Sequence, residues 1–242
     1  KNIAAGNNYT RNFNYDTGLN TLDNITIGIN SFSFDFDGNG NMTLENTDRH
    51  YEWDFADKMR SFYRQTATSE PTVYAQYLYD AAGNRTKKIV RTAGGDYSVT
   101  TYIDGIMEFH RKVSGANTFR KSYAYVMDDK KIISEIREVN GNPFPGDITD
   151  SIVYHIDDHL GSCNVRLEAT NGTEIDREES YPFGESSMHT FAFKRYRYCG
   201  KEKDDESGLY YYGARYYQPW TCRFISIDPL AEKYTYRQLL YY

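Results

Sequence analysis

The sequence predicts an ordered, all-β protein, and three observations carry this prediction. Aromatic residues make up 16% of the chain, with 24 tyrosines and 13 phenylalanines, so tyrosine supplies much of the core area, which argues against disorder. Alternation of apolar and polar residues recurs along the chain, whereas helical periodicity is nearly absent before residue 228. Clusters of Asp, Asn and Gly, which form turns, separate the alternating segments. These patterns predict β-hairpins stacked into an antiparallel sheet.

One motif recurs: aromatic residues at alternate positions, an aspartate, a turn and an outgoing strand. The clearest copy is YLYDAAGNRTKKIV, residues 77–90. Tyr77 and Tyr79 share one face of a strand, Asp80 ends it, and Gly83 tolerates the positive φ of a tight hairpin. Other copies lie in segments 13–16, 34–45, 51–64, 101–113, 123–136 and 153–168. A single hairpin cannot bury its own face, so the copies are predicted to stack on one another.

Two further segments interrupt or end this pattern. The Pro- and Gly-rich stretch NGNPFPGDITDS, residues 140–151, is predicted to be a surface loop rather than a domain boundary, because the strand pattern resumes after it. Near the end, Asp228 and Pro229 suit the first turn of a short helix, which is predicted to run from Asp228 to Leu240. The first residues read like the interior of a longer polypeptide, so the chain is expected to be a piece of one.

The tyrosine-rich stretch GLYYYGARYYQPWTCRFISIDPL, residues 208–230, allows two interpretations. Tyr210 and Tyr212 alternate with their neighbours as in a strand, which predicts packing against the inner face of a sheet. The alternative is a stacking platform for carbohydrate or nucleic-acid bases. A net charge of −6 argues against a surface that binds nucleic acid, because such a surface must be basic.

The cysteines Cys163, Cys199 and Cys222 show no metal-binding spacing and are predicted to be buried thiols. A Cys199–Cys222 disulfide is the alternative. No apolar run is long enough to span a membrane, which takes about 18 residues.

Two segments were tested for metal ligands. DFDGNG, residues 35–40, matches the first half of a calcium-binding EF-hand loop, but Asn46 stands where the loop needs a glutamate. His155 and His159 would share one face of a helix, but the surrounding alternation predicts a strand that runs into a turn. Both segments are therefore interpreted as turns, and the sequence predicts neither a metal site nor a cofactor.

These segments resemble a known family. YLYDAAGNRTKKIV looks like the YD repeat of Rhs proteins, and the stretches DHLGS, YPFG, GKE and GLYYYGARYY are similar to the Rhs-repeat-associated core region. The C-component of insecticidal toxin complexes and many polymorphic bacterial toxins carry the same core. The resemblance implies a spiralling antiparallel sheet that closes into a hollow shell, or cocoon. Residues 1–150 would form the YD-repeat hairpin sheet, and residues 151–242 the core region that closes the shell.

The resemblance also implies a function and partners. The shell would enclose and deliver a C-terminal toxin domain, together with other shell or secretion-complex components. No nucleic-acid partner is expected. Such a protein would be bacterial and secreted, or associated with the cell surface. The alternative from a different class is an extracellular adhesion or carbohydrate-binding YD-repeat module.

A self-cleavage site is the second implication. In related proteins an aspartate that follows the GARYY segment works with a second, downstream aspartate, and the arginine of GAR assists. The corresponding residues are Asp228 and Arg215, and no aspartate follows Asp228 in this chain. Two carboxylates are needed because one is ionised while the other holds a proton. We therefore expect no enzymatic activity from these 242 residues, which would supply half of an aspartate autoprotease to a longer parent.

Overall fold

The computed structural model describes residues 10–17, 21–129, 131–141, 148, 150–190 and 194–230. Within these ranges the protein is built from two antiparallel sheets and one three-residue 3-10 turn, η1 (Tyr198–Gly200). The first eight strands of the larger sheet are β1 (Arg11–Tyr15), β2 (Leu22–Ile27), β3 (Asn30–Phe36), β4 (Met42–Glu45), β5 (Arg49–Trp53), β6 (Met59–Arg64), β7 (Val73–Tyr79) and β8 (Arg85–Thr92). Its other strands are β9 (Tyr97–Ile103), β10 (Met107–Ser114), β11 (Asn117–Asp128), β12 (Lys131–Val139), β13 (Ile152–Asp157), β14 (Cys163–Glu168), β15 (Glu174–Ser180) and β16 (Ser186–Thr190). The smaller sheet holds β17 (Glu202–Asp204), β18 (Leu209–Tyr211), β19 (Tyr216–Gln218) and β20 (Arg223–Phe224).

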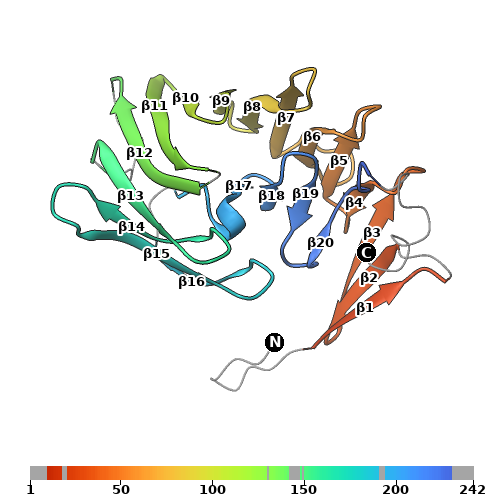
Figure 1. The fold of residues 1–242 in the computed structure, drawn as a ribbon. Coiled ribbons are helices and arrows are strands. Elements are labelled where there is room, and N and C mark those ends of the chain that lie inside the picture. The colour runs from red at the N-terminus through yellow and green to blue at the C-terminus, as the bar shows by residue number, and fades with distance from the viewer. Residues whose placement is uncertain are drawn as a thin grey trace.

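The larger sheet is a meander in which each strand pairs with the next along the chain, from β1 to β16. Figure 1 shows this sheet as an open curve, with the smaller sheet β17–β20 lying in its hollow. The all-β prediction and the long antiparallel sheet of hairpins are confirmed. β12 and β13 pair across the Pro- and Gly-rich segment, so the sheet continues past residue 150. The division into domains at that residue stays a prediction.

The recurrent motif forms one repeated turn. In the clearest copy, Asp80 Oδ1 accepts hydrogen bonds from the backbone N–H groups of Ala82 (2.9 Å) and Asn84 (2.8 Å). Gly83 then adopts a φ of +82°, which an L side chain rarely takes. Asp37, Asp54 and Asp158 make the same pair of bonds to the second and fourth residues after them. The segment considered as a calcium loop, and the turn after His155, are therefore copies of the hairpin turn.

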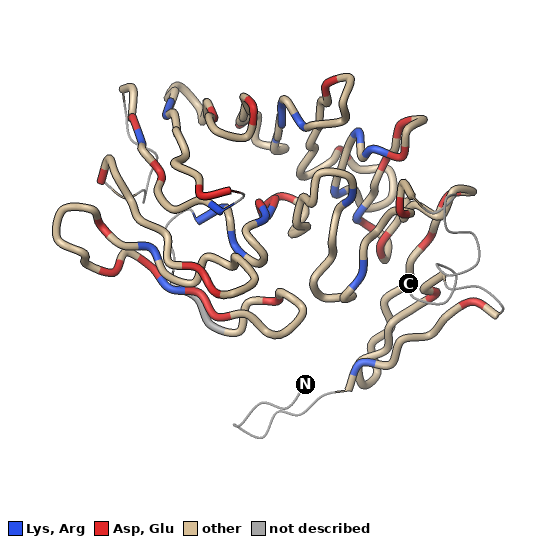
Figure 2. Tube along the Cα trace, viewed as in Figure 1, with Lys and Arg blue, Asp and Glu red and all other residues tan. Residues whose placement is uncertain are grey.

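The inward face of the larger sheet changes in character along the chain. From β2 to β7 it is mostly apolar: Ile25, Met59 and Phe62 have no exposed surface, and Glu45 is a buried charged residue among apolar ones. From β8 to β16 charged side chains take many of the buried positions, among them Glu108, Arg166 and Asp176. Figure 2 shows basic and acidic residues next to one another along this second part. Both kinds of interior face the hollow that holds the smaller sheet.

The predictions for the cysteines and the C-terminus have separate outcomes. Cys163, Cys199 and Cys222 are all free thiols, so the alternative disulfide is not formed, but only Cys163 is buried as predicted, and the other two are half-buried. Residues 228–230 form a turn in which the N–H of Leu230 donates to Asp228 Oδ1 at 2.8 Å. The rest of the predicted helix, residues 231–240, lies outside the described residues. In the part of the chain that is described, no helix has the length and apolarity to cross a membrane.

Candidate functional site

The smaller sheet packs into the hollow mainly through the predicted tyrosine run. Tyr210 has no exposed surface and Tyr216 is 2% exposed. The Tyr216 ring contacts Tyr77 of β7, with ring centroids 5.7 Å apart, and its hydroxyl lies 3.1 Å from that of Tyr79. These contacts favour inner-face packing over an exposed stacking platform.

Tyrosine hydroxyls also attach the C-terminal segment, residues 194–230, to the turn between β15 and β16. Three of them donate to consecutive backbone carbonyls: Tyr198 to Pro182 (2.8 Å), Tyr217 to Phe183 (3.0 Å) and Tyr210 to Gly184 (3.2 Å). A Cβ at Gly184 would lie 2.6 Å from the Tyr198 ring, so only glycine fits there. The YPFG and GLYYYGARYY segments that carry the family resemblance therefore meet at one place.

On its other side the smaller sheet contacts the first strands of the larger one. The Trp220 indole N–H donates to Glu45 Oε1 (3.0 Å), and the Gln218 amide donates to Glu45 Oε2 (2.8 Å). Arg11 of β1 donates to the backbone carbonyl of Trp220 and also forms an ion pair of 2.7 Å with Glu185, next to the start of β16. The C-terminal segment therefore joins both ends of the curved sheet.

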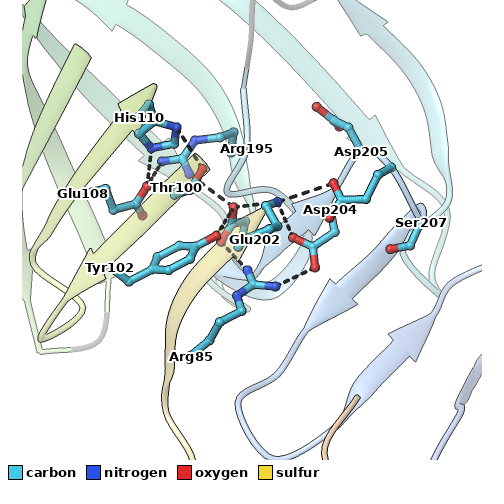
Figure 3. Close-up of polar contacts among 12 residues, drawn as sticks. Arg85, Thr100, Tyr102, Glu108, His110, Arg195, Glu202, Asp204, Asp205 and Ser207 are labelled. Carbon is cyan, nitrogen blue, oxygen red and sulfur yellow. Dashed lines mark hydrogen bonds and ion pairs between the residues drawn. The ribbon is translucent and has the colours of Figure 1, made fainter. Parts of the chain in front are cut away.

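Between these two attachments lies a buried network of charges, drawn in Figure 3. Arg85, from the start of β8, contacts Glu202 and Asp204 of β17 at 2.6 Å each. Lys88, three residues further along β8, contacts Asp204 at 2.6 Å. The side chains of Arg85, Glu202 and Asp204 are at most 3% exposed. Charges this deeply buried are tolerated only when they are paired.

The network continues across β9 and β10. Arg195 contacts Glu202 at 3.2 Å and also pairs with Glu108 of β10. His110 Nε2 lies 2.8 Å from Glu108, and the Tyr102 hydroxyl donates to Glu202 at 3.1 Å. Glu202 therefore lies between basic residues that come from different segments of the chain, β8 and the segment before β17.

The network perturbs the titration of its members. Burial alone would raise the pKa of Glu202, but the cations Lys88, Arg85 and Arg195 bring that pKa well below its usual value. Burial raises the pKa of Glu206, and the charge of Asp204 adds to that effect. Burial, followed by repulsion from Arg195, lowers the pKa of His110 to about 4. The ion pairs of Arg85 and Lys88 in β8 with Glu202 and Asp204 in β17 therefore hold the two sheets together.

The two residues named as self-cleavage candidates lie together. Arg215 Nη2 is 3.1 Å from Asp228 Oδ2, and both side chains are 16% exposed. The Arg215 guanidinium also sits 3.8 Å from the centre of the Phe224 ring, which fixes its position. A strand that folds back over a turn thus brings them into contact across thirteen residues of sequence. Their catalytic role stays a prediction.

The sequence did not predict the buried charge network. Arg85 and Glu202 are far apart in the chain, and no local pattern pairs them. One signal was present. Charged residues occupy alternate positions on β10 and β12, whereas an antiparallel sheet that packs one face on an apolar core has apolar residues at those alternate positions. Charges at inward positions indicate partners brought from elsewhere in the fold.

Comparison with known proteins places these features in context. Toxin subunit YenC1 of Yersinia entomophaga is 27% identical over 240 residues, which cover 93% of this chain and 24% of that protein. Toxin subunit YenC2 of the same species is 41% identical over 96 residues, which cover 37% of this chain and 10% of that protein. The chain is similar to Rhs-type toxin subunits. The resemblance stated from the sequence is thereby confirmed.

The fold comparison agrees. The crystal structure of TcdB2-TccC3 superimposes with a TM-score of 0.74 at 23% identity, covering 91% of this chain and 12% of that chain. The present chain therefore spans less than a quarter of the proteins it matches. No family model matches it. These similarities show that the chain shares its fold with part of the TcdB2-TccC3 structure.

Proposed function

We propose that this chain is a shell segment of a bacterial toxin protein, which encloses a C-terminal toxin domain and delivers it. The observation that carries the proposal is the curved 16-stranded sheet that holds its own C-terminal segment in its hollow. Arg85, Glu202 and Asp204 fix that segment from inside. The last described part of that segment lies at the β3–β4 turn, where the Ile227 N–H donates to Asn41 Oδ1 at 3.4 Å. The parent would be secreted or associated with the cell surface and would assemble with other shell components.

Protection from proteolysis tests enclosure in the full-length natural polypeptide. We expect the region after residue 242 to resist a protease that digests the same region when it is expressed alone. Arg85→Met, which removes the central cation of the network, should expose that region to cleavage. Arg60→Met is the matched control, because the Arg60–Glu52 pair is on the surface, with side chains 66% and 38% exposed. Equal digestion of the region in the full-length protein and in isolation would refute enclosure.

The same parent is proposed to release its C-terminal domain by self-cleavage, with Arg215 and Asp228 in the reactive site. The 3.1 Å contact between them supports this, since a cation beside one carboxylate favours its ionised form. The second aspartate of the pair would come from the region after Tyr242. This proposal is separable from enclosure, because a shell can enclose a domain without cutting the chain.

A second candidate function is carbohydrate binding by the outer face. His50, Tyr63 and Tyr74 stack across β5, β6 and β7, with ring centroids 4.7 and 5.9 Å apart. Their neighbours Tyr51, Phe62 and Ala75 are buried on the inward face, so the three rings face outward. A ladder of partly exposed rings suits the apolar faces of sugars.

Binding to a glycan array tests this second candidate. Tyr63→Ala, which removes the middle ring, should abolish any glycan signal that the protein gives. Phe55→Ala is the control, since Phe55 is 99% exposed in a turn and lies outside the ladder. If the glycan signal survives Tyr63→Ala, or if the protein gives no signal at all, the three stacked rings do not bind carbohydrate and only pack against one another.

A further inference from the structure

A set of metal-ligating side chains lies on the β13–β14 hairpin, away from the charge network. His155, Asp157 and Cys163 each offer a ligand atom, and these atoms all lie within 4.8 Å of one another. His155 and Asp157 project from the same face of β13, two residues apart. Asp157 and Cys163 are paired across the hairpin, where a shift in register bends the strands. Strand pairing thus brings together three donors that the sequence did not associate.

Two of these donors have polar atoms without a hydrogen-bond partner. His155 Nε2 and Asp157 Oδ1 are both buried and both unsatisfied. The nearest carboxylate oxygen to His155 Nε2, Glu135 Oε2, is 3.5 Å away, which is too long for a good hydrogen bond. The Cys163 thiol makes one long contact, 3.8 Å from the carbonyl of Val165. Unsatisfied buried groups are costly, so two at one place indicate a missing partner.

A cavity of about 340 Å³ adjoins the three side chains. Its lining includes all three of them, together with Asp128 and Asp129 from the turn after β11. Lys131 and Lys201 also line the cavity and balance the two aspartates, so the preference for a metal ion rests on the three donors themselves. The cavity also has room for a water molecule or another small ligand beside the three donors.

We propose that His155, Asp157 and Cys163 bind a Zn²⁺ ion, with the fourth coordination position facing the cavity. A nitrogen, an oxygen and a sulfur donor form a mixed set that suits zinc better than calcium or magnesium, which take oxygen ligands. Ligand atoms bound to zinc at about 2.0–2.3 Å in a tetrahedron are about 3.5 Å apart. Side-chain rotation must therefore bring these donors about 1 Å closer together.

The ion would strengthen a seam of the fold. The N–H of Cys163 donates to the carbonyl of Arg197 at 3.3 Å, and the Lys194 ammonium bonds to the carbonyl of Cys163. β14 is thus the strand against which the C-terminal segment begins its path into the hollow. An ion held by β13 and β14 would fix this strand pair, and protein that binds it should melt at a higher temperature.

Metal titration of the purified chain tests the site. The protein is first freed of metal with a chelator, and zinc is then added. We expect elemental analysis to find one bound Zn²⁺ per chain, and we expect the melting temperature to rise on zinc addition. With Co²⁺ as the probe, a thiolate-to-cobalt charge-transfer band should appear and reach its maximum at one equivalent. Absence of this band, or binding of less than one equivalent, would overturn the proposal.

Matched variants assign the ligands. Cys163→Ser should remove the charge-transfer band, and Asp157→Asn, which is nearly isosteric, should weaken zinc binding by more than the 10–100-fold typical of outer-shell partners. Cys199→Ser and His159→Gln are controls: Cys199 lines the same cavity outside the ligand set, and His159 is exposed. Circular dichroism confirms that each variant is folded. Equal binding by Asp157→Asn and the unmodified protein, or loss of the band in Cys199→Ser, would refute this ligand set.

Discussion

The two halves of the larger sheet share one hairpin design but have different interiors. In β2 to β7 the inward side chains are mostly apolar, and the apolar ones form a cluster with three residues of the C-terminal segment, Leu209, Tyr216 and Ile225. In β8 to β16 the inward positions carry charges, such as Glu135, which lies 3.1 Å from Arg166. The same turn chemistry therefore supports two kinds of interior.

The difference separates two tasks. Apolar packing is non-directional and stabilises any arrangement that excludes water. Buried ion pairs add less net stability, because desolvation offsets their attraction, but they tolerate few alternative partners. Arg85 and Lys88 at the boundary are paired with β17, so the path of the C-terminal segment is fixed by charge where the apolar cluster ends. We infer that the apolar half provides stability and the charged half provides position.

The largest expected effect comes from removing the boundary cation. Arg85→Met leaves Glu202 and Asp204 buried next to fewer cations, and we expect a loss of about 3–5 kcal/mol in the free energy of unfolding. Urea unfolding measures it. Arg60→Met, at an exposed ion pair, should cost less than about 1 kcal/mol. If the two variants lose equal stability, the charged interior does not position the C-terminal segment.

Acid should weaken the charged half in two steps. Burial lowers the pKa of His110 to about 4; Arg195 and Lys121 add to this effect and Glu108 opposes it. As the pH falls, His110 therefore becomes protonated in the unfolded chain before it does so in the folded protein. Stability should therefore fall on the order of 3 kcal/mol between about pH 6.5 and pH 4. The lowered pKa of Glu202, held down by Lys88, Arg85 and Arg195, adds a second loss as the pH falls below about 4.5.

Unfolding measured across this pH range separates the steps. His110→Gln should flatten the step between about pH 6.5 and pH 4 and keep the step below it. His159→Gln, at an exposed position, should leave the whole profile unchanged. A profile that His110→Gln does not alter would show that another group is responsible for the first step.

Local features of this fold could be predicted from the sequence, and long-range ones could not. Asp80 and Gly83 predict their turn, because the aspartate accepts a hydrogen bond from a backbone N–H that follows it and the glycine takes a positive φ. The inward packing of Tyr210 follows from alternation. In contrast, the contact of Arg85 with Asp204 depends on how the whole sheet curves, and the proximity of His155 to Cys163 depends on strand register. No short segment encodes either.

A smaller effect is expected at the repeated turn, which both halves share. Asp80→Ala removes two hydrogen bonds to backbone N–H groups, so we expect a lower melting temperature than that of the unmodified protein. Asp80→Asn keeps an acceptor oxygen and should cost clearly less. The same substitutions at Asp54, in the apolar half, should give similar values because its turn has the same bonds. Thermal unfolding of the four variants checks this, and a large difference between the two positions would mean that the interior also governs the turns.

The smallest effect on stability is expected at Asp228, which contacts Arg215 at 3.1 Å near the end of the described chain. Asp228→Asn keeps the oxygen that accepts the Leu230 N–H bond and loses only the charge, so we expect a change of about 1 kcal/mol or less. In the full-length parent, the same substitution should abolish release of the C-terminal domain, because an amide cannot take the proton that an acid–base pair of carboxylates exchanges. Gel electrophoresis of the purified parent reports release, and its melting temperature reports folding. Release at the normal rate by a folded Asp228→Asn protein would leave this residue with the capping role alone, and the tyrosine-rich segment would then serve only to hold the C-terminal segment inside the curved sheet.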